Sequence, residues 1–390
     1  MGSLDVLCFG GEDWWYHNRA HVDMQLMRRM ATRGTTLYVN SLVMQKPRLQ
    51  EGRLFVQKLI RKVRSISSGL RPSDAGFWVY SPFSFPVHHI KGACELNVAL
   101  LQGQLELVMR KLGQKRPLIW VACPPACPTA LRLRKGALVY QRTDRFEEFP
   151  GVDSQLVAGY DTTMKREADL TLFVNQTLYE EEQDQCRRAI YLDHGVDFET
   201  FSQAEQDKTI PKDIADLSGP IVGFFGGIAP HTTDMKLIRE VVDQLPDLPF
   251  VFVGSTPPEF DADMSTRPNV RLVGKKDYEE IPHYGKRFSV AIMPWNKNRW
   301  IAACNPIKLK EYLALGKPIV STPFRELCNY DGLVYTAQDS RQFADQIRRA
   351  LREDSPEKIA ARRNRVREHA WDKKAQTLVE CLESSGAIQC

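Results

Sequence analysis

Residues 305–322 read NPIKLKEYLALGKPIVST, and this stretch marks both ends of a helix. Asn305 is a favoured N-cap, and Pro306 suits the first helical position because its missing amide would be unpaired there anyway. Gly316 stands where a left-handed C-cap is wanted, and Pro318 follows where no helix can continue. The stretch therefore predicts a helix of about three turns, followed by a buried strand.

Two charged side chains lie on one face of this expected helix. Lys308 and Glu311 are three residues apart, and Lys308 falls in the first turn, where free amides and the helix dipole favour an anion. A diphosphate fits such a position, and Glu311 can accept hydrogen bonds from the vicinal hydroxyls of a ribose. An ordinary amphipathic helix with solvated lysines has the same pattern, so the spacing alone does not decide between the two interpretations.

The segment resembles the C-terminal donor-site motif of family 4 glycosyltransferases, the retaining GT-B group, in the form NP-x-K-x-x-EYLA-x-GKP. The resemblance implies that Glu311 binds the nucleotide ribose and that Lys308 binds the diphosphate. Family members often carry a second glutamate eight positions before the ribose-binding one, and Ala303 stands there in this chain. The donor-binding residues that the motif implies are Asn305, Pro306, Ile307, Lys308 and Glu311.

Length and composition indicate a globular protein with more than one domain. The 390 residues are enough for two separate cores, and the apolar fraction of 43% and charged fraction of 26% are ordinary. We find no apolar run of about 18 residues and no basic leader, so we expect a cytoplasmic protein. The nine scattered cysteines fit free thiols, and we expect Cys123 and Cys127 to pack a strand end rather than bind a metal.

Positive charge is concentrated between residues 46 and 71, in KPRLQEGRLFVQKLIRKVRSISSGLR. Apolar residues recur among these cations at helical spacing, which indicates a basic amphipathic helix. Such a helix can lie on an anionic membrane surface, where each cation contributes on the order of 1 kcal/mol. It can equally be a surface helix whose apolar stripe completes its own domain. The absence of an aromatic-interleaved basic groove argues against nucleic acid as a partner.

Short β-branched runs alternate with helical patterns along the chain, which predicts doubly wound sheets. The strands expected in the first half lie at residues 4–9, 36–40, 77–80, 118–122, 137–141, 170–174 and 189–192. Those expected in the second half lie at residues 221–225, 250–254, 270–273, 290–293 and 319–321. The fold class that follows is α/β with two Rossmann-like domains, and the GT-B resemblance implies a cleft between them.

A polar stretch at residues 197–219 separates the two halves. We therefore expect an N-terminal acceptor domain at 1–200, a linker at 201–219 and a nucleotide-sugar donor domain at 220–370. Residues 371–390 resemble the terminal helix that crosses back to the first domain in GT-B enzymes.

The first expected strand ends in FGGEDWWYHNRAH, where Gly10 and Gly11 permit a tight turn before a helix. The turn lacks the GxGxxG pattern, and no acid ends the second strand, which argues against a dinucleotide oxidoreductase. In GT-B enzymes a glycine-rich loop here lets the diphosphate approach, which implies a donor contact for Gly11. Trp15 can stack on a sugar ring or cover the core. His17 and His21 are four residues apart, but no third ligand stands at a spacing that would complete a metal site. The acceptor-binding residues expected from this loop are Trp15, His17 and Arg19.

A second glycine turn, Gly226–Gly227, follows the first strand of the second half in GFFGGIAPHTTD. Amides freed there can reach the distal phosphate of a donor. The resembling family often supplies an arginine and a lysine from this loop, and neither occurs here before Lys236. Lys275 follows VRLVG at the place where family members bind the nucleotide base, largely through backbone atoms.

Asp144 follows an expected strand in YQRTDRFEEFPG, on the side of an open α/β sheet where ligands bind. Its carboxylate can accept the proton of an acceptor hydroxyl, and Arg145 can balance the charge on the acceptor side. A turn-capping role would explain Asp144 equally well. Asp261 and Asp263 form a DxD in an expected loop, and we assign them no metal. The resemblance implies a diphosphate neutralised by lysine and helix amides, without a metal or other cofactor.

These observations predict transfer of a sugar from a nucleotide diphosphate sugar to a hydroxyl of a glycan or lipid-linked acceptor. The expected catalytic residues are Lys308, which stabilises the leaving diphosphate, and Asp144. The resemblance implies retention of configuration and a place in bacterial polysaccharide or glycolipid synthesis. The basic pattern of 46–71 is the separate basis for expecting peripheral membrane contact. Two alternatives stay open: a nucleotide-sugar epimerase of similar architecture, and a catalytically silent partner subunit that binds nucleotide sugars.

Overall fold

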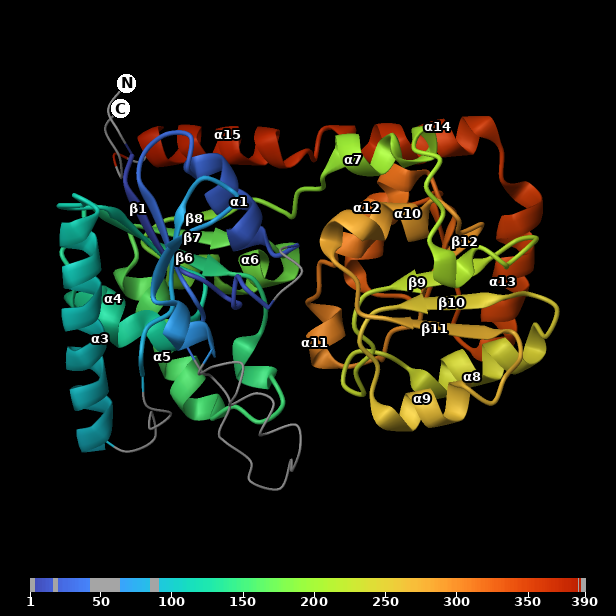
Figure 1. Cartoon of the computed structure of the whole chain (residues 1–390), viewed down its shortest axis with the longest axis horizontal. Coiled ribbons are helices and arrows are strands. Elements are labelled where there is room, and N and C mark those ends of the chain that lie inside the picture. Colours follow the sequence, from blue (N-terminus) through green and yellow to red (C-terminus); the bar gives the residue numbers. More distant parts are fainter. Residues whose placement is uncertain (1–3, 17–19, 43–63, 85–90, 385, 387–390) are drawn as a thin grey trace. The chain divides into compact units, whose positions relative to one another are not determined.

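The computed structural model describes residues 4–16, 20–42, 64–84, 91–384 and 386, and the side chains from residue 94 onward in the helix that begins at 91. These residues form two compact units (Figure 1). Unit 1 comprises residues 1–193 and 374–390, and unit 2 comprises residues 194–373. No described helix is long and apolar enough to cross a membrane.

Unit 1 is built on one eight-stranded sheet in the order β3-β4-β2-β1-β5-β6-β7-β8. All neighbouring strands are parallel except β3, which pairs antiparallel with β4 at the edge. The four residues of β1 are completely or almost completely buried, as expected for a central strand covered on both faces. The strands are β1 (Val6–Phe9), β2 (Thr36–Val39), β3 (Leu70–Pro72), β4 (Trp78–Tyr80), β5 (Leu118–Val121), β6 (Ala137–Arg142), β7 (Leu170–Phe173) and β8 (Ala189–Tyr191).

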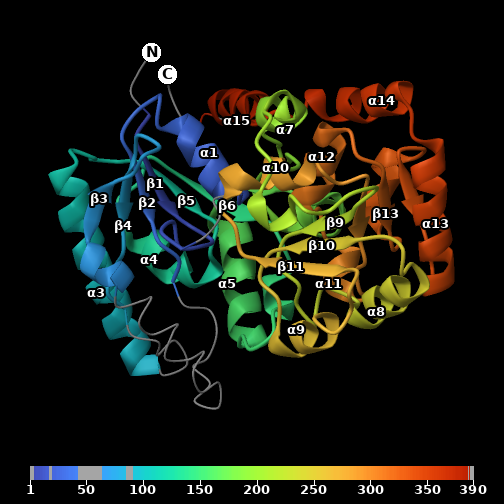
Figure 2. The ribbon, with the colours of Figure 1, turned by 45° about the vertical axis from the view of Figure 1, so that its right-hand side comes forward.

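Helices connect these strands, and α3, α4 and α5 pack against one another along one face of the sheet (Figures 1 and 2). The last helix, α15, begins in unit 2, and its residues from Lys374 onward group with unit 1, where Lys374 pairs with Asp193. The helices are α1 (Val22–Met30), α3 (Lys91–Lys111), α4 (Cys127–Arg132), α5 (Ser154–Glu167), α6 (Gln176–Glu182) and α15 (Trp371–Ser384), with 3₁₀ turns η2 (Pro124–Ala126), η3 (Phe146–Glu148) and η4 (Gln183–Gln185).

Unit 2 has a six-stranded, fully parallel sheet in the order β11-β10-β9-β12-β13-β14. Counted along the unit this order is 3-2-1-4-5-6, which is the doubly wound Rossmann arrangement. The strands are β9 (Val222–Phe225), β10 (Phe250–Val253), β11 (Val270–Gly274), β12 (Val290–Met293), β13 (Ile319–Ser321) and β14 (Val334–Thr336).

Two helical layers cover this second sheet. Helices α8 and α13 pack together on one face, where Ile238, Val241, Phe343 and Ile347 join the core, and α12 packs against α10 and α14. The helices are α7 (Phe198–Ser202), α8 (Met235–Gln244), α9 (Pro258–Met264), α10 (Ile281–Gly285), α11 (Arg299–Ala302), α12 (Ile307–Leu315), α13 (Ser340–Glu353) and α14 (Pro356–Arg367), with 3₁₀ turns η5 (Ala204–Gln206), η6 (Lys212–Ile214), η7 (Tyr278–Glu280) and η8 (Arg325–Tyr330).

The predicted fold class is confirmed, and every strand expected from the sequence is present within about two residues. The structure adds β3 and β14, which the sequence did not indicate. Both are three-residue edge strands without a fully buried residue, so they lack the continuous apolar run that marks a buried strand.

Residues 201–219, expected as a linker, group with unit 2. They contain η5 and η6, and Ile214 is completely buried. Asp213 accepts hydrogen bonds from the Tyr284 hydroxyl at 2.9 and 3.0 Å and pairs with Lys276 at 2.9 Å. This segment is thus held against α10 and the end of β11.

Candidate functional site

The topology of unit 2 marks one place on its sheet where a ligand can bind. The strand order reverses between β9 and β12, so the connections leaving these two strands run to opposite faces. In open α/β sheets the crevice at the carboxyl end of such a pair is the usual binding site. Gly226 follows β9 at this edge, and α12 begins in the segment after β12.

Helix α12 is fastened to the carboxyl end of β9. The Tyr312 hydroxyl accepts a hydrogen bond from the Phe225 amide at 2.9 Å, and the two rings lie 4.3 Å apart between centroids. At the other end Gly316 is left-handed with φ 78°, and the Lys317 amide donates to the Tyr312 carbonyl at 2.9 Å. This is a Schellman C-cap, so the predicted end of the helix at Gly316 is confirmed.

The predicted start of the helix is wrong in one respect. Asn305 does not cap α12: the residue before the helix is Pro306, and no side chain caps the first amides. The Asn305 side-chain oxygen instead accepts a hydrogen bond from Lys310 Nζ at 3.2 Å, and both residues are buried. A completely buried ammonium group needs such a hydrogen-bond partner, because an unpaired buried charge is costly. The N-cap residue of α12, Pro306, thus supplies no side-chain cap to the first-turn amides.

A glycine makes room for the lysine of the first turn. Gly226 has φ 121°, a conformation that other residues rarely adopt, and a Cβ atom there would lie 2.5 Å from Lys308 Nζ. The Gly226 carbonyl is in turn approached closely by Gly254, where a Cβ atom would come within 2.0 Å. The glycine turn after β9 thus lets the Lys308 amine reach across the end of the strand.

Lys308 is half-buried, and its amine lies between two aromatic rings. Nζ is 4.3 Å from the centroid of Phe224 and 5.6 Å from that of Trp295, within the range of cation–π attraction. Burial lowers the pKa of Lys308 to about 8, and the charge of Glu311 opposes that shift. Among the described residues no carboxylate lies within 4.0 Å of this amine, so its charge is available to an anion.

Glu311 lies one turn further along α12 and is 4% exposed. One carboxylate oxygen accepts a hydrogen bond from the Tyr278 hydroxyl at 2.8 Å, which orients the group. Burial raises the pKa of Glu311 to about 7, although the Tyr278 hydrogen bond and the charge of Lys308 both lower it. A buried carboxylate with one oriented oxygen is suited to accept hydrogen bonds from neighbouring hydroxyls of a ligand.

The remaining donor residues predicted from sequence lie around this edge of unit 2. Gly227 follows Gly226, and a Cβ atom there would lie 3.3 Å from Ser255 Oγ at the end of β10. Lys275 is exposed just after β11, and Ile307 is half-buried in the first turn of α12. Ala303 is buried after α11, so no carboxylate stands at the position where family members often have one.

The carboxyl edge of the unit 1 sheet carries a second set of predicted residues. The Gly11 amide donates to Asp23 Oδ2 at 2.9 Å, and the Tyr38 hydroxyl donates to the same oxygen at 2.8 Å. A Cβ atom on Gly10 would lie 2.1 Å from the Tyr38 ring, whereas at Gly11 the nearest atom would be 3.6 Å away. Gly10 is therefore the glycine that the packing requires, and Gly11 faces the more open side.

Asp144 follows β6 at this same edge. Burial raises the pKa of Asp144 to about 6, and the positive charges of His21 and Arg142 limit the rise. The Arg145 guanidinium pairs with Glu181. A carboxyl group with this pKa can accept a proton near neutral pH.

The aromatic residues after β1 divide between core and edge. Trp14 is completely buried and packs edge-on against Phe77 with ring centroids 4.7 Å apart, so it belongs to the core. Trp15 is half-buried, and its backbone amide donates to Asp13 Oδ1 at 3.0 Å. His17 and Arg19 lie outside the described residues, as does most of the basic segment 46–71.

The DxD pair lies on helix α9, so the expectation of a loop there is wrong. Pro258 opens this helix and acids fill its first turn, both of which favour a helix start. Asp263 pairs with Arg239 at 2.6 Å and with Arg267 at 2.8 Å, and Asp261 accepts from Thr256 at 2.5 Å. The described residues hold no group of three or more His, Cys, Asp or Glu side chains that could bind a metal ion.

Sequence reasoning did not identify Tyr278, Phe224 and Trp295 as parts of the site. Each lies outside the motif that contains Lys308 and Glu311, and the strand order of the sheet brings them together. Phe224 and Trp295 are aromatic residues near the end of an apolar run, and core packing explains such residues equally well. Tyr278 follows the polar residues KKD and carries no such signal.

Comparison with solved structures identifies the fold class. The chain superposes on Anabaena HepE crystallised with UDP and glucose, with a TM-score of 0.68 and 14% identity, covering 98% of this chain and 100% of the other. It also superposes on sucrose-phosphate synthase from Thermosynechococcus elongatus, with a TM-score of 0.71 and 14% identity over 98% of each chain. The two parallel-sheet domains are thus those of the GT-B glycosyltransferase fold.

The sequence of the chain matches one family model and one curated relative. Residues 219–353, which lie in unit 2, match the family model described as Glycosyl transferases group 1. The chain is also 38% identical over 138 residues to the Bacillus subtilis protein named "Putative teichuronic acid biosynthesis glycosyltransferase TuaH". This alignment spans 34% of the chain and about a third, 33%, of that curated relative.

Proposed function

We propose that the protein is a glycosyltransferase that moves a sugar from a nucleotide diphosphate sugar to a hydroxyl of a glycan or lipid-linked acceptor. The family match over residues 219–353 supports this activity, and it includes both Lys308 and Glu311. The single observation that carries the proposal is the Lys308 amine in the first turn of α12, at the strand-order reversal of a Rossmann sheet, with no carboxylate of the described residues paired to it.

The residues of unit 2 would divide the work of holding the donor. The Lys308 ammonium and the first-turn amides of α12 would bind the diphosphate, and Glu311 would accept hydrogen bonds from the ribose hydroxyls. When the bond from sugar to phosphate breaks, negative charge grows on the leaving diphosphate, and positive groups already in place stabilise it. The proposed mechanism therefore needs no divalent cation at the diphosphate.

UDP is the first nucleotide to test, because HepE, which shares this fold, was crystallised with UDP and UDP-glucose. The relative from Bacillus subtilis is named for teichuronic acid synthesis, which supports a place in bacterial polysaccharide synthesis. Asp144 is our candidate for the group that receives the acceptor proton. We propose retention of configuration on the strength of the motif around Lys308 alone.

A turnover assay with a panel of UDP- and GDP-sugars tests the proposal. We expect nucleotide release that depends on a glycan acceptor and persists in EDTA. The variant Glu311→Ala should lose this activity, whereas Glu279→Ala, an exposed glutamate of η7, should retain it. Conversion of the donor sugar without acceptor would contradict transfer and favour an epimerase. Tight nucleotide binding without any turnover would contradict it as well and indicate a silent partner subunit.

A further inference from the structure

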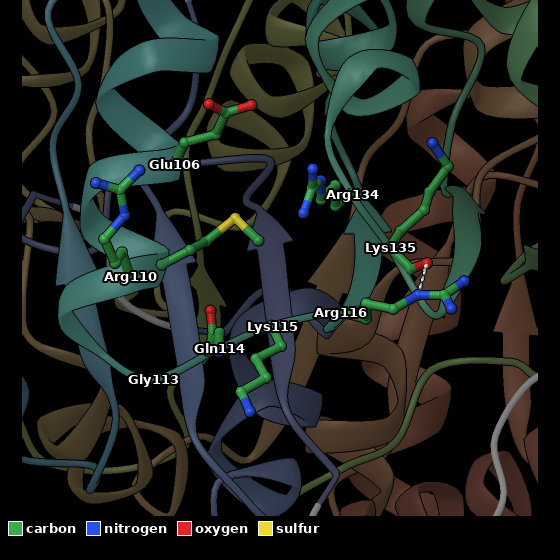
Figure 3. Close-up of a pocket in the computed structure, with 9 residues that line it drawn as sticks. Glu106, Arg110, Gly113, Gln114, Lys115, Arg116, Arg134 and Lys135 are labelled. Atoms are coloured by element: carbon green, nitrogen blue, oxygen red, sulfur yellow. Dashed lines mark hydrogen bonds between the residues drawn. The ribbon is translucent and has the colours of Figure 1, made fainter.

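A basic cavity lies on unit 1 (Figure 3). It has a volume of about 970 Å³ and is formed by the last turns of α3, the loop from α3 to β5 and the loop from α4 to β6. The residues that line it are Glu106, Met109, Arg110, Gly113, Gln114, Lys115, Arg116, Arg134 and Lys135.

The cavity is at the edge of the sheet opposite Asp144 and Gly11. Its two loops immediately precede β5 and β6, so they lie at the amino ends of these parallel strands. Asp144 and Gly11 follow the carboxyl ends of β6 and β1. Because the strands run parallel, the two sets of residues are separated by the full length of the sheet. The cavity is therefore distinct from the proposed acceptor side.

Positive charge dominates the lining. Four arginine or lysine side chains, Arg110, Lys115, Arg116 and Arg134, are exposed, and Lys135 is half-buried. Glu106 is the one acid among the lining residues. Within the part of the chain that the structure describes, none of these five cations has a carboxylate within ion-pair distance of 4.0 Å. Unpaired like charges gathered around one hollow repel one another, and a bound anion removes that cost.

The floor of the cavity is held in place by hydrogen bonds. Gln114 is buried, and its Nε2 donates to the Val6 carbonyl at 3.1 Å and to the Thr35 carbonyl at 2.7 Å. Arg116 Nε donates to the Lys135 carbonyl at 3.2 Å, which ties the two loops together, as the dashed line in Figure 3 shows.

Lys135 has a different role from the other four cations. Its Nζ donates to the carbonyls at the end of α4, at 2.9 Å for Leu131 and 3.3 Å for Ala130 and Leu133. Burial lowers the pKa of Lys135. Lys135 thus caps the C-terminal end of α4 and holds this side of the cavity in place. The arginines have further N–H groups that can bind a ligand.

We propose that this cavity is a second anion site, which binds a ligand with two or more phosphate groups. Guanidinium groups bind phosphate through paired N–H donors, and three arginines around one hollow match a ligand with several phosphate oxygens. The volume is at the upper end of the range for small-molecule sites, which leaves room for more than a single inorganic ion. A free diphosphate compound and the head group of a lipid with two phosphates share this chemistry.

Calorimetric titration of the full chain with inorganic pyrophosphate tests the site. The double variant Arg116→Glu/Arg134→Glu should weaken binding at least about tenfold, because two charge-assisted contacts are lost. The control Lys208→Glu/Arg341→Glu changes the net charge equally at two exposed cations of unit 2 and should bind as the wild type does. Equal binding by all three proteins, or no binding by the wild type, would overturn the proposal.

The donor site of unit 2 could also take pyrophosphate, and the variant Lys308→Gln separates the two. If the cavity binds pyrophosphate, Lys308→Gln should still bind it and Arg116→Glu/Arg134→Glu should not. This result does not depend on whether the protein transfers sugars. The opposite pattern would overturn the cavity proposal. Circular dichroism checks that the charge-reversed protein is folded, and the milder pair Arg116→Gln/Arg134→Gln should weaken binding in the same direction.

Vesicle sedimentation distinguishes the two sources of phosphate. Vesicles of phosphatidylcholine with about 30% cardiolipin, whose head group carries two phosphates, should bind the wild type and should not bind Arg116→Glu/Arg134→Glu if the ligand is a lipid head group. If the protein does not bind vesicles, and its binding of pyrophosphate depends on these arginines, the ligand is a free phosphorylated compound. Vesicle binding unchanged in the variant, together with unchanged pyrophosphate binding, would contradict both.

Discussion

Replacing Glu311 with glutamine should stabilise the unliganded protein at alkaline pH. The pKa of this carboxyl group rises from an ordinary 4.5 to about 7 because the group is buried. Between these two pH values the folded protein binds more protons than the unfolded chain, so the free energy of unfolding falls as pH rises. Glutamine does not titrate, and it can still accept the hydrogen bond from Tyr278.

The size of the effect follows from the pKa difference. One pH unit corresponds to about 1.4 kcal/mol, so the ionisable group costs about 3 kcal/mol of stability at pH 8 and under about 1 kcal/mol at pH 5. Between pH 5 and pH 8 the wild type should therefore lose about 2–3 kcal/mol more than Glu311→Gln. Any packing cost of the glutamine amide is independent of pH and cancels from this difference.

Urea unfolding at pH 5 and pH 8 measures this difference, with the transition of unit 2 followed separately because a two-domain chain need not unfold in one step. The exposed neighbour Glu279→Gln serves as control and should follow the wild type within about 0.5 kcal/mol. A pH dependence of Glu311→Gln equal to that of the wild type would refute the assignment of a buried, proton-binding carboxyl group. The same substitution should weaken UDP binding about tenfold or more, because hydrogen bonds to a charged acceptor are lost.

Three further predictions concern the predicted site residues at the carboxyl ends of the two sheets. UDP affinity should be highest between about pH 7 and pH 8, because the Glu311 carboxylate forms above a pKa of about 7 and the Lys308 ammonium is lost above about 8; titration calorimetry across pH 5–10 would show a flat profile if these groups do not bind the ligand. Gly226→Ala should reduce UDP binding at least about tenfold and destabilise the protein by about 1–3 kcal/mol, because alanine is strained at φ 121° and its methyl group displaces the Lys308 amine; an unchanged thermal shift with UDP would contradict this. If Asp144 receives the acceptor proton, the transfer rate should rise with pH through about 6, and Asp144→Asn should abolish that rise along with most of the activity.

The parts of the fold that follow from local chemistry were predictable from sequence. The buried strands have continuous apolar runs, and the left-handed glycine at 316 with Pro318 behind it ends α12 as expected. The edge strands β3 and β14 are short and partly exposed, so their side chains carry no such signal.

The surroundings of the candidate site depended on contacts distant in the chain. The helix start was misassigned because the Asn305 side chain bonds to buried Lys310, which no local preference indicates. Tyr278 reaches Glu311 only through the order of strands in the sheet. The motif thus located Lys308 and Glu311 on one helix, and the pKa values and aromatic partners of these residues required the folded structure.

A crystal structure of the protein soaked with UDP would show whether Lys308 and Glu311 hold the nucleotide. We predict the diphosphate at the first turn of α12, with a phosphate oxygen about 2.7–3.0 Å from Lys308 Nζ and the ribose hydroxyls on the Glu311 carboxylate. Nucleotide bound elsewhere on the chain, with the Lys308 amine still between Phe224 and Trp295 and no phosphate beside it, would contradict this assignment of the donor site.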